Sequence, residues 1–99
     1  MGRPLVKGTE KHRAIGSRVR FERLNRDIPR AAVASHLGID VSVYGRIEIG
    51  QVALTLEKAD KIADFIGVPI TRLGVKLSPT EAVQLRNLIL NERKRKRAA

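Results

Sequence analysis

The stretch HLGIDVSVYGRIEIG, residues 36–50, constrains the fold more than any other part of this chain. Its valines and tyrosine favour a β-strand, because β-branched and aromatic side chains suit a pleated sheet, and its glycines mark turns. Asp40 indicates a helix instead, since aspartate is a preferred N-cap that accepts hydrogen bonds from the free N–H groups of the following turn. As a helix beginning at Val41, the stretch places Tyr44 and Ile47 on one inward face. The local pattern alone is compatible with both structures.

The segments before this stretch have a helical pattern. Ile15, Val19 and Arg23 recur every four positions between residues 14 and 26, and no helix breaker follows Gly16, which predicts a first helix there. A second, short helix is expected over residues 29–37, because Pro29 suits the first turn of a helix. Gly38 is expected to end this helix as a left-handed C-terminal cap.

Helical patterns also follow the stretch. Thr55 is an N-cap residue before an apolar repeat of helical spacing, and the sequence VPITRLG leaves room only for a short helix after it. SPTE, residues 78–81, is a capping box with proline at the first helical position. It predicts a last helix that reaches Glu92 and has more apolar surface than one packing face needs. The run RKRKR, residues 93–97, is expected to be a frayed tail.

Composition excludes several classes of protein. Ninety-nine residues fit one domain with a modest core, and the lack of cysteine excludes disulfides and thiolate zinc sites. No apolar run is long enough to span a bilayer, and the first dozen residues lack the apolar region of a signal peptide. No nucleophile–base set, metal-ligand cluster or phosphate loop is visible. We therefore expect a cytoplasmic protein that is not an enzyme and that needs neither a metal nor a cofactor.

The net charge of +10 is concentrated at the two ends of the chain. Residues 1–14 carry four basic side chains against one acidic, residues 15–74 carry nine against seven, and residues 75–99 carry seven against two. Basic ends around a nearly balanced middle indicate a folded module with extensions that seek a polyanion, most commonly nucleic acid. We expect a flexible basic arm over residues 1–13, a folded domain over residues 14–74, and a C-terminal helix with a basic tail over residues 75–99.

Two short helices joined at a glycine, followed by Glu-x-Gly and two more helices, resemble the domains of the Cro and CI repressor family of XRE-type helix-turn-helix regulators. The unit RAAVASHLGIDVSVYGRIEIG has the small Ala34 where two helices nearly touch and Gly38 in the turn. RIEIG and LEKADKIADFIGVPITRL extend the match over about residues 15–73. The resemblance implies an all-α fold, with a five-helix lambda-repressor-like helix-turn-helix domain and an added C-terminal helix.

The resemblance makes the helix that begins at Val41 a recognition helix, which enters the major groove of DNA. The residues expected to read bases are Val41, Ser42, Val43 and Arg46. Arg46 can donate two hydrogen bonds to guanine, Ser42 can bind a base edge or a phosphate, and the two valines can pack on thymine methyl groups.

Phosphate contacts are expected from Arg30 at the start of the second helix, from Gln51 and from Tyr44. For Tyr44, which replaces a usual aliphatic residue, a position in the core is the favoured interpretation. The basic ends are expected to strengthen DNA binding without sequence preference. Their contributing residues are Arg3, Lys7, Arg13, Arg93, Lys94 and Arg95.

A further implication of the resemblance concerns Arg23 and Glu48. In this family, an arginine late in the first helix and a glutamate late in the third commonly form a partly buried ion pair. Such a pair locks the recognition helix to the rest of the domain. The alternative is two unrelated surface charges, and the family spacing favours the pair.

These features predict a small transcriptional regulator, a repressor, that binds double-stranded DNA as a homodimer on a palindromic operator. The last helix is the natural dimer element, unless its apolar stripe packs on the chain's own helices. The main alternative is an antitoxin-type module that binds a protein partner, a toxin or an antirepressor, and regulates its own synthesis. Binding of RNA is less favoured, because none of the few aromatic residues forms a stacking platform.

Overall fold

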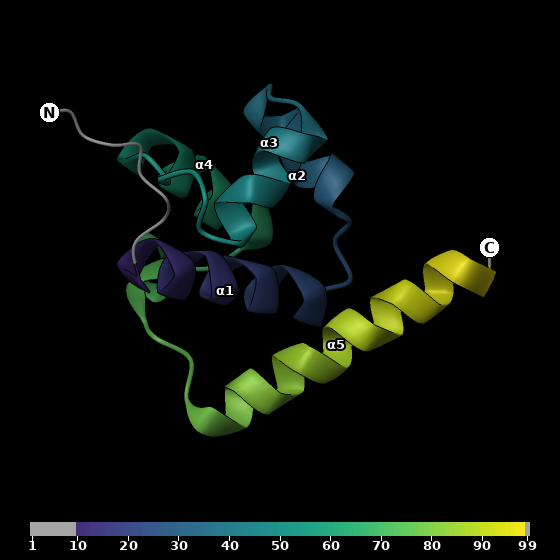
Figure 1. Ribbon diagram of the computed structural model, residues 1–99. Coiled ribbons are helices and arrows are strands. Elements are labelled where there is room, and N and C mark those ends of the chain that lie inside the picture. The colour runs from purple at the N-terminus through teal and green to yellow at the C-terminus, as the bar shows by residue number, and fades with distance from the viewer. Residues whose placement is uncertain (1–9, 99) are drawn as a thin grey trace, which may run out of the picture.

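The computed structural model describes residues 10–98, and every regular element in this range is a helix. In chain order these are α1 (Glu10–Asn25), α2 (Arg30–Leu37), α3 (Val41–Glu48), α4 (Leu56–Ile66), the 3-10 helix η1 (Ile70–Gly74) and α5 (Pro79–Ala98). α1 crosses the middle of the molecule, with α2, α3 and α4 on one side of it and α5 on the other (Figure 1). The expected all-α fold is confirmed.

Residues 36–50 are helical on both sides of their turn. Gly38 ends α2 with a left-handed backbone, φ 71° and ψ 31°, which glycine adopts without the steric cost of a β-carbon. Asp40 has an extended backbone, and its carboxylate accepts a hydrogen bond of 3.0 Å from the N–H of Ser42. This cap satisfies one of the free N–H groups at the start of α3. The strand interpretation is therefore excluded.

The main core lies between α1, α2, α3, α4 and η1, and each of them contributes to it. It consists of Val19, Val33, Ala34, Tyr44, Ile62, Ala63, Ile66 and Leu73. Ile62, Ala63 and Ile66 come from α4 and lie on one face of this helix. That face is buried, and the opposite face is exposed to solvent. The core thus holds α2 and α3 against the rest of the domain.

Two helix boundaries differ from the expected ones. α1 begins at Glu10, so residues 10–13 belong to a helix and not to an arm; an acidic residue in the first turn suits the helix dipole. α5 continues to Ala98 instead of ending near Glu92. The basic run 93–97 contains only lysine and arginine, which are good helix formers, and no glycine or proline interrupts it.

α5 packs on α1 through a second apolar cluster. Phe21 and Leu24 of α1 lie against Leu85 of α5, and Leu77, Leu88 and Ile89 surround them. Part of the apolar surface of α5 is therefore used within the chain. Val83 and Leu90 lie outside this contact, because Val83 is 57% exposed and Leu90 is 47% exposed.

A buried arginine fixes the start of α5 to α1. The side chain of Arg18 is 1% exposed and donates hydrogen bonds to Glu22 at 2.9 Å, to Glu81 at 2.9 Å and to the carbonyl oxygen of Val75 at 2.8 Å. Glu81 also accepts from the backbone N–H of Ser78, and the hydroxyl of Ser78 accepts from the N–H of Glu81, which confirms the capping box. The hydrogen bonds from Arg18 and from the Ser78 backbone lower the pKa of Glu81 to about 2.

Candidate nucleic-acid interface

α3 divides its side chains between the core and the surface. Tyr44, Ile47 and Glu48 are buried, Val43 is partly buried, and Val41, Ser42 and Arg46 are exposed. Val41 is 43% exposed, so its methyl groups are available to a partner outside the chain. The structure thus places Val41, Ser42 and Arg46, three of the four residues expected to read bases, on the outer side of one short helix, and the fourth, Val43, is partly buried.

Ser42 takes part in the cap of its own helix. Its hydroxyl donates a hydrogen bond to the carboxylate of Asp40, and its backbone N–H donates to the same oxygen. These two hydrogen bonds lower the pKa of Asp40, so the carboxylate stays ionised. With its proton engaged, the Ser42 hydroxyl remains able to accept a hydrogen bond, such as one from the amino group of a base.

The ion pair between Arg23 and Glu48 is present and buried. Arg23 Nε lies 2.6 Å from Glu48 Oε2, Arg23 Nη2 lies 3.1 Å from Glu48 Oε1, and the two side chains are 0% and 1% exposed. Arg23 Nη1 also donates to the carbonyl oxygen of Ile28 at 2.7 Å and lies 3.5 Å from Glu92 of α5. One guanidinium therefore joins α1, the turn before α2, the end of α3 and α5.

A glycine allows α1 to touch the end of α3. A β-carbon on Gly16 would lie 2.4 Å from the carbonyl oxygen of Glu48 and 2.5 Å from that of Ile47. Both distances are far shorter than a van der Waals contact, so only glycine fits at this point. The recognition helix is therefore set against α1 by a backbone contact as well as by the ion pair.

Tyr44 does not contact phosphate, and the prediction that placed it among the phosphate-binding residues is wrong. Its relative exposure is 0%, and it belongs to the main core. Burial and the nearby charge of Glu48 raise the pKa of its phenol well above the ordinary value of 10.0. The ring replaces an aliphatic residue inside the domain, in agreement with the favoured interpretation.

The start of α2 has no side-chain cap, because Pro29 occupies the N-cap position. The N–H of Ala32 donates to the carbonyl oxygen of Pro29 at 3.1 Å, which leaves the N–H groups of Arg30 and Ala31 without an acceptor among the described residues. Arg30 is the first residue of α2 and is partly buried, and Gln51 is exposed just after the end of α3. A helix N-terminus with free N–H groups and an adjacent arginine is suited to bind a phosphate.

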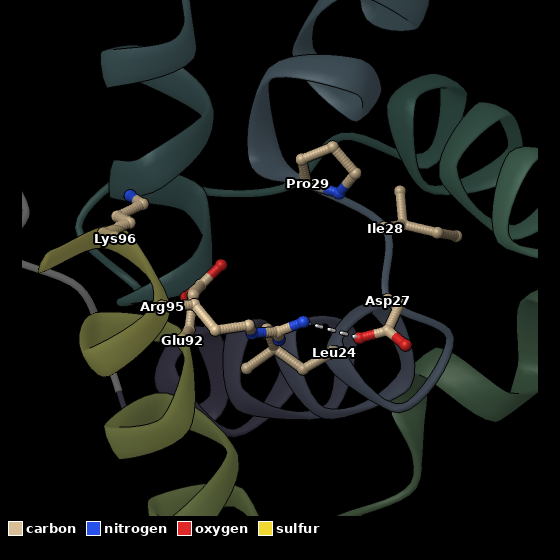
Figure 2. Close-up of a pocket in the computed structure, with 7 residues that line it drawn as sticks. All are labelled: Leu24, Asp27, Ile28, Pro29, Glu92, Arg95 and Lys96. Carbon is tan, nitrogen blue, oxygen red and sulfur yellow. Dashed lines mark hydrogen bonds and ion pairs between the residues drawn. The ribbon is translucent and has the colours of Figure 1, made fainter. Parts of the chain in front are cut away.

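The basic ends of the chain lie in different settings. Arg3 and Lys7 fall outside the described residues, and Arg13 lies in α1, where its backbone is close to Gly50. Arg93, Lys94 and Arg95 are exposed on the last turns of α5. These turns lie beside the α1–α2 turn, where a shallow pocket of about 360 Å³ is lined by Leu24, Asp27, Ile28, Pro29, Glu92, Arg95 and Lys96 (Figure 2). Arg95 pairs there with Asp27 at 3.3 Å.

Two residues near the ion pair were not anticipated from the sequence. Arg20 of α1 lies 3.7 Å from Glu48, and Glu92 of α5 approaches Arg23. The position of Arg20 had a detectable signal, because it follows Gly16 by four residues and precedes Arg23 by three, which places it on the same helix face. The position of Glu92 had none, because it depends on how α5 crosses α1.

Residues 10–98 contain no cluster of three or more histidine, cysteine, aspartate or glutamate side chains that could hold a metal ion. Over the same range, no helix has the length and apolar character needed to cross a membrane.

A protein-family model described as Helix-turn-helix matches residues 19–73, more than half of the chain. The chain belongs to this family. The XRE-type resemblance is thereby confirmed, and the matched range contains α2, α3, α4 and η1 together with most of α1. Members of this helix-turn-helix family are DNA-binding regulators of transcription. α5 lies beyond the matched range.

Individual relatives agree with the family. The chain is 37% identical over 57 residues to the cryptic phage CTXphi transcriptional repressor RstR of Vibrio cholerae, a match that covers 58% of this chain and 51% of that protein. The chain thus spans about half the length of this curated relative.

Solved structures show the same helical arrangement. The restriction-modification controller protein C.AhdI of Aeromonas hydrophila has a TM-score of 0.62 at 25% identity, covering 66% of this chain and 98% of that one. The DNA-binding domain of BldD has a TM-score of 0.58 at 25% identity, covering 70% and 97%. The hypothetical transcription factor NHTF of Neisseria shares the fold, with a TM-score of 0.62 at 20% identity and coverage of 85% and 97%.

Proposed function

We propose that this helix-turn-helix protein is a transcriptional repressor that binds a palindromic operator as a dimer in the cytoplasm. The observation that carries this proposal is the setting of α3, whose outer side is exposed while its inner side is held by the buried pair of Arg23 and Glu48. A short helix held in this way can enter the major groove with its N-terminal residues against the bases. The similarity to a phage protein named as a transcriptional repressor supports repression rather than activation of transcription.

The base contacts follow from the chemistry of the exposed side chains. Arg46 donates two hydrogen bonds to the O6 and N7 atoms of a guanine, a contact that contributes about 1–3 kcal/mol of discrimination. Val41 and Val43 pack on thymine methyl groups. Ser42 accepts from a base amino group while its own proton stays bonded to the Asp40 cap. This surface has fewer polar base contacts than a recognition helix rich in glutamine and asparagine.

Phosphates on either side of the groove are held by the start of α2 and by basic side chains. Arg30 acts together with the free N–H groups of α2, and Gln51 binds the backbone beyond the end of α3. The exposed end of α5, with Arg93 and Lys94, lies beside the α1–α2 turn and continues this contact along the duplex. These contacts strengthen binding to all sequences alike.

One recognition helix reads few base pairs, so two copies of the protein share an operator with half-sites about one helical turn apart. The exposed residues Val83 and Leu90 lie two turns apart on α5, and we assign the dimer contact to this stripe. Leu88 is not part of it, because this side chain packs against the chain's own α1 cluster.

Selection from random duplexes, followed by footprinting, tests the proposal. Enrichment of an inverted repeat with two protected half-sites is the expected result. Equal affinity for all duplexes at physiological salt contradicts sequence-specific binding, and enrichment of a single unrepeated half-site contradicts the dimer.

A further inference from the structure

Arg20 lies at the junction of α1 and α3 with its guanidinium only partly satisfied. Its Nε is buried and has no hydrogen-bond partner among the described residues, since the nearest carboxylate oxygen, Glu48 Oε1, is 3.7 Å away. This separation allows attraction between charges but is too long for a hydrogen bond. The side chain as a whole remains 20% exposed, so part of it reaches the surface.

Glu48 does not balance the charge of Arg20, because its carboxylate is already paired with Arg23. Both carboxylate oxygens of Glu48 accept hydrogen bonds from Arg23, at 2.6 and 3.1 Å. Burial is the main cause that lowers the pKa of Arg20. The negative charge of Glu48 raises this pKa in part, and the positive charges of Arg23 and Arg30 lower it. The junction therefore holds more positive charge than its carboxylates balance.

Arg30 supplies the second half of the arrangement. Its Nη1 lies 3.4 Å from the place where a β-carbon on residue 45 would sit, so Gly45 gives the guanidinium room to lie along α3. Within residues 10–98 no carboxylate pairs with Arg30 and no acceptor takes a hydrogen bond from its side chain. Arg20 from α1 and Arg30 from α2 thus both lie against α3, at Glu48 and Gly45, which are three residues apart on this helix. Neither of them forms a hydrogen bond with a carboxylate among the described residues.

We propose that Arg20 and Arg30 together hold one phosphate of the DNA backbone, next to the end of α3. A phosphodiester supplies acceptor oxygens for the terminal nitrogens of both guanidinium groups, while the buried Nε of Arg20 stays beside Glu48. Arginine suits this contact because its planar fork can donate two hydrogen bonds. The free N–H groups at the start of α2 lie on the same element as Arg30 and favour the same negative charge. The inference rests on the proposed DNA-binding function and assigns Arg20 a role in it.

The test is a salt titration of binding to the selected duplex, with Arg20→Gln, Arg30→Gln and the double variant. Each single variant should bind about tenfold more weakly, as expected when a charged hydrogen bond is removed. The slope of log affinity against log salt should fall by about 0.9 for each phosphate that the variant no longer neutralises. Because the remaining arginine still neutralises the shared phosphate in each single variant, both single variants should keep the slope, and only the double variant should lose about 0.9. Lys76→Gln, which removes one positive charge at an exposed position between η1 and α5, is the matched control and should leave affinity and base preference unchanged.

Circular dichroism at each salt concentration distinguishes removal of a phosphate-binding charge from partial unfolding. It gives the folded fraction of each variant, so the affinities are corrected for unfolded protein before the slopes are compared. Arg20→Lys, which keeps the charge, should keep the slope of the unmodified protein even when it is combined with Arg30→Gln.

The inference is overturned if Arg20→Gln binds as tightly as Lys76→Gln, if a single variant alone loses a slope of about 0.9, or if the double variant keeps the slope of the unmodified protein. In each case the proposed function stands, because the unmodified protein still binds. Failure of the unmodified protein to bind any duplex overturns the proposed function and this inference together.

Discussion

Replacement of Glu48 by glutamine should destabilise the domain strongly, because it leaves the positive charge of Arg23 buried without its main partner. Both side chains are essentially inaccessible to solvent, at 0% and 1% exposed. Breaking a fully buried pair by removing one partner costs about 3–5 kcal/mol. Arg23 keeps its hydrogen bond of 2.7 Å to the carbonyl oxygen of Ile28 and its approach of 3.5 Å to Glu92. We therefore expect a loss of about 3 kcal/mol, at the lower end of that range.

Urea unfolding followed by circular dichroism measures this loss as a change in the free energy of unfolding. Glu57→Gln is the matched control, because Glu57 is 80% exposed and lies 3.8 Å from Lys61 on the surface of α4. An exposed pair of this kind contributes less than about 0.5 kcal/mol. If Glu48→Gln changed the free energy of unfolding by no more than Glu57→Gln does, the pair would not be what holds α3 in place.

Three further changes test other parts of the structure. Gly16→Ala should destabilise the domain by more than about 1 kcal/mol, because its β-carbon meets the end of α3. Gly74→Ala is the control, since a β-carbon at this position meets nothing within 4 Å. Equal urea unfolding midpoints for the two variants would refute the close approach of α1 and α3. The pKa of Glu81 is lowered from 4.5 to about 2, so its contribution to stability is complete above pH 4.5 and is lost as the pH falls toward 2. Glu81→Gln should flatten this part of the curve of urea midpoint against pH, and an unchanged curve would contradict the role of the Arg18 hydrogen bonds. Leu90→Asp should convert dimers to monomers in sedimentation without lowering the unfolding midpoint, and a dimer that persists would exclude the α5 stripe.

Local signals predicted the caps and the turn of the helix-turn-helix unit, and the family resemblance decided that the residues after Asp40 form a helix. Asp40 and Gly38 act through their own backbone and nearest neighbours, so the cap and the turn can be predicted from a single sequence. The SPTE capping box can be predicted for the same reason. The valines of α3 gave a misleading strand signal, because β-branched residues are also tolerated on a helix when a partner packs against them.

Features that depend on packing between distant segments were not predictable. Arg18 meets Glu81 across 63 residues of chain, and nothing in the local pattern of either residue indicates that hydrogen bond. For Tyr44 the sequence favoured a position in the core but left a phosphate contact open, and only the packing of its neighbours decides for the core. The length of α5 was underestimated because a run of like charges indicated fraying, although each of its residues favours a helix.

The most direct test of the central claim, that α3 reads DNA sequence, is the affinity of Arg46→Ala for every single base-pair variant of the selected half-site. We predict that this variant loses its preference at one position per half-site, by about 1–3 kcal/mol, and keeps it elsewhere. Arg30→Ala, measured on the same duplexes, should weaken binding to all of them alike. An Arg46→Ala protein that retained every base preference of the unmodified protein would contradict the assignment of α3 as the recognition helix.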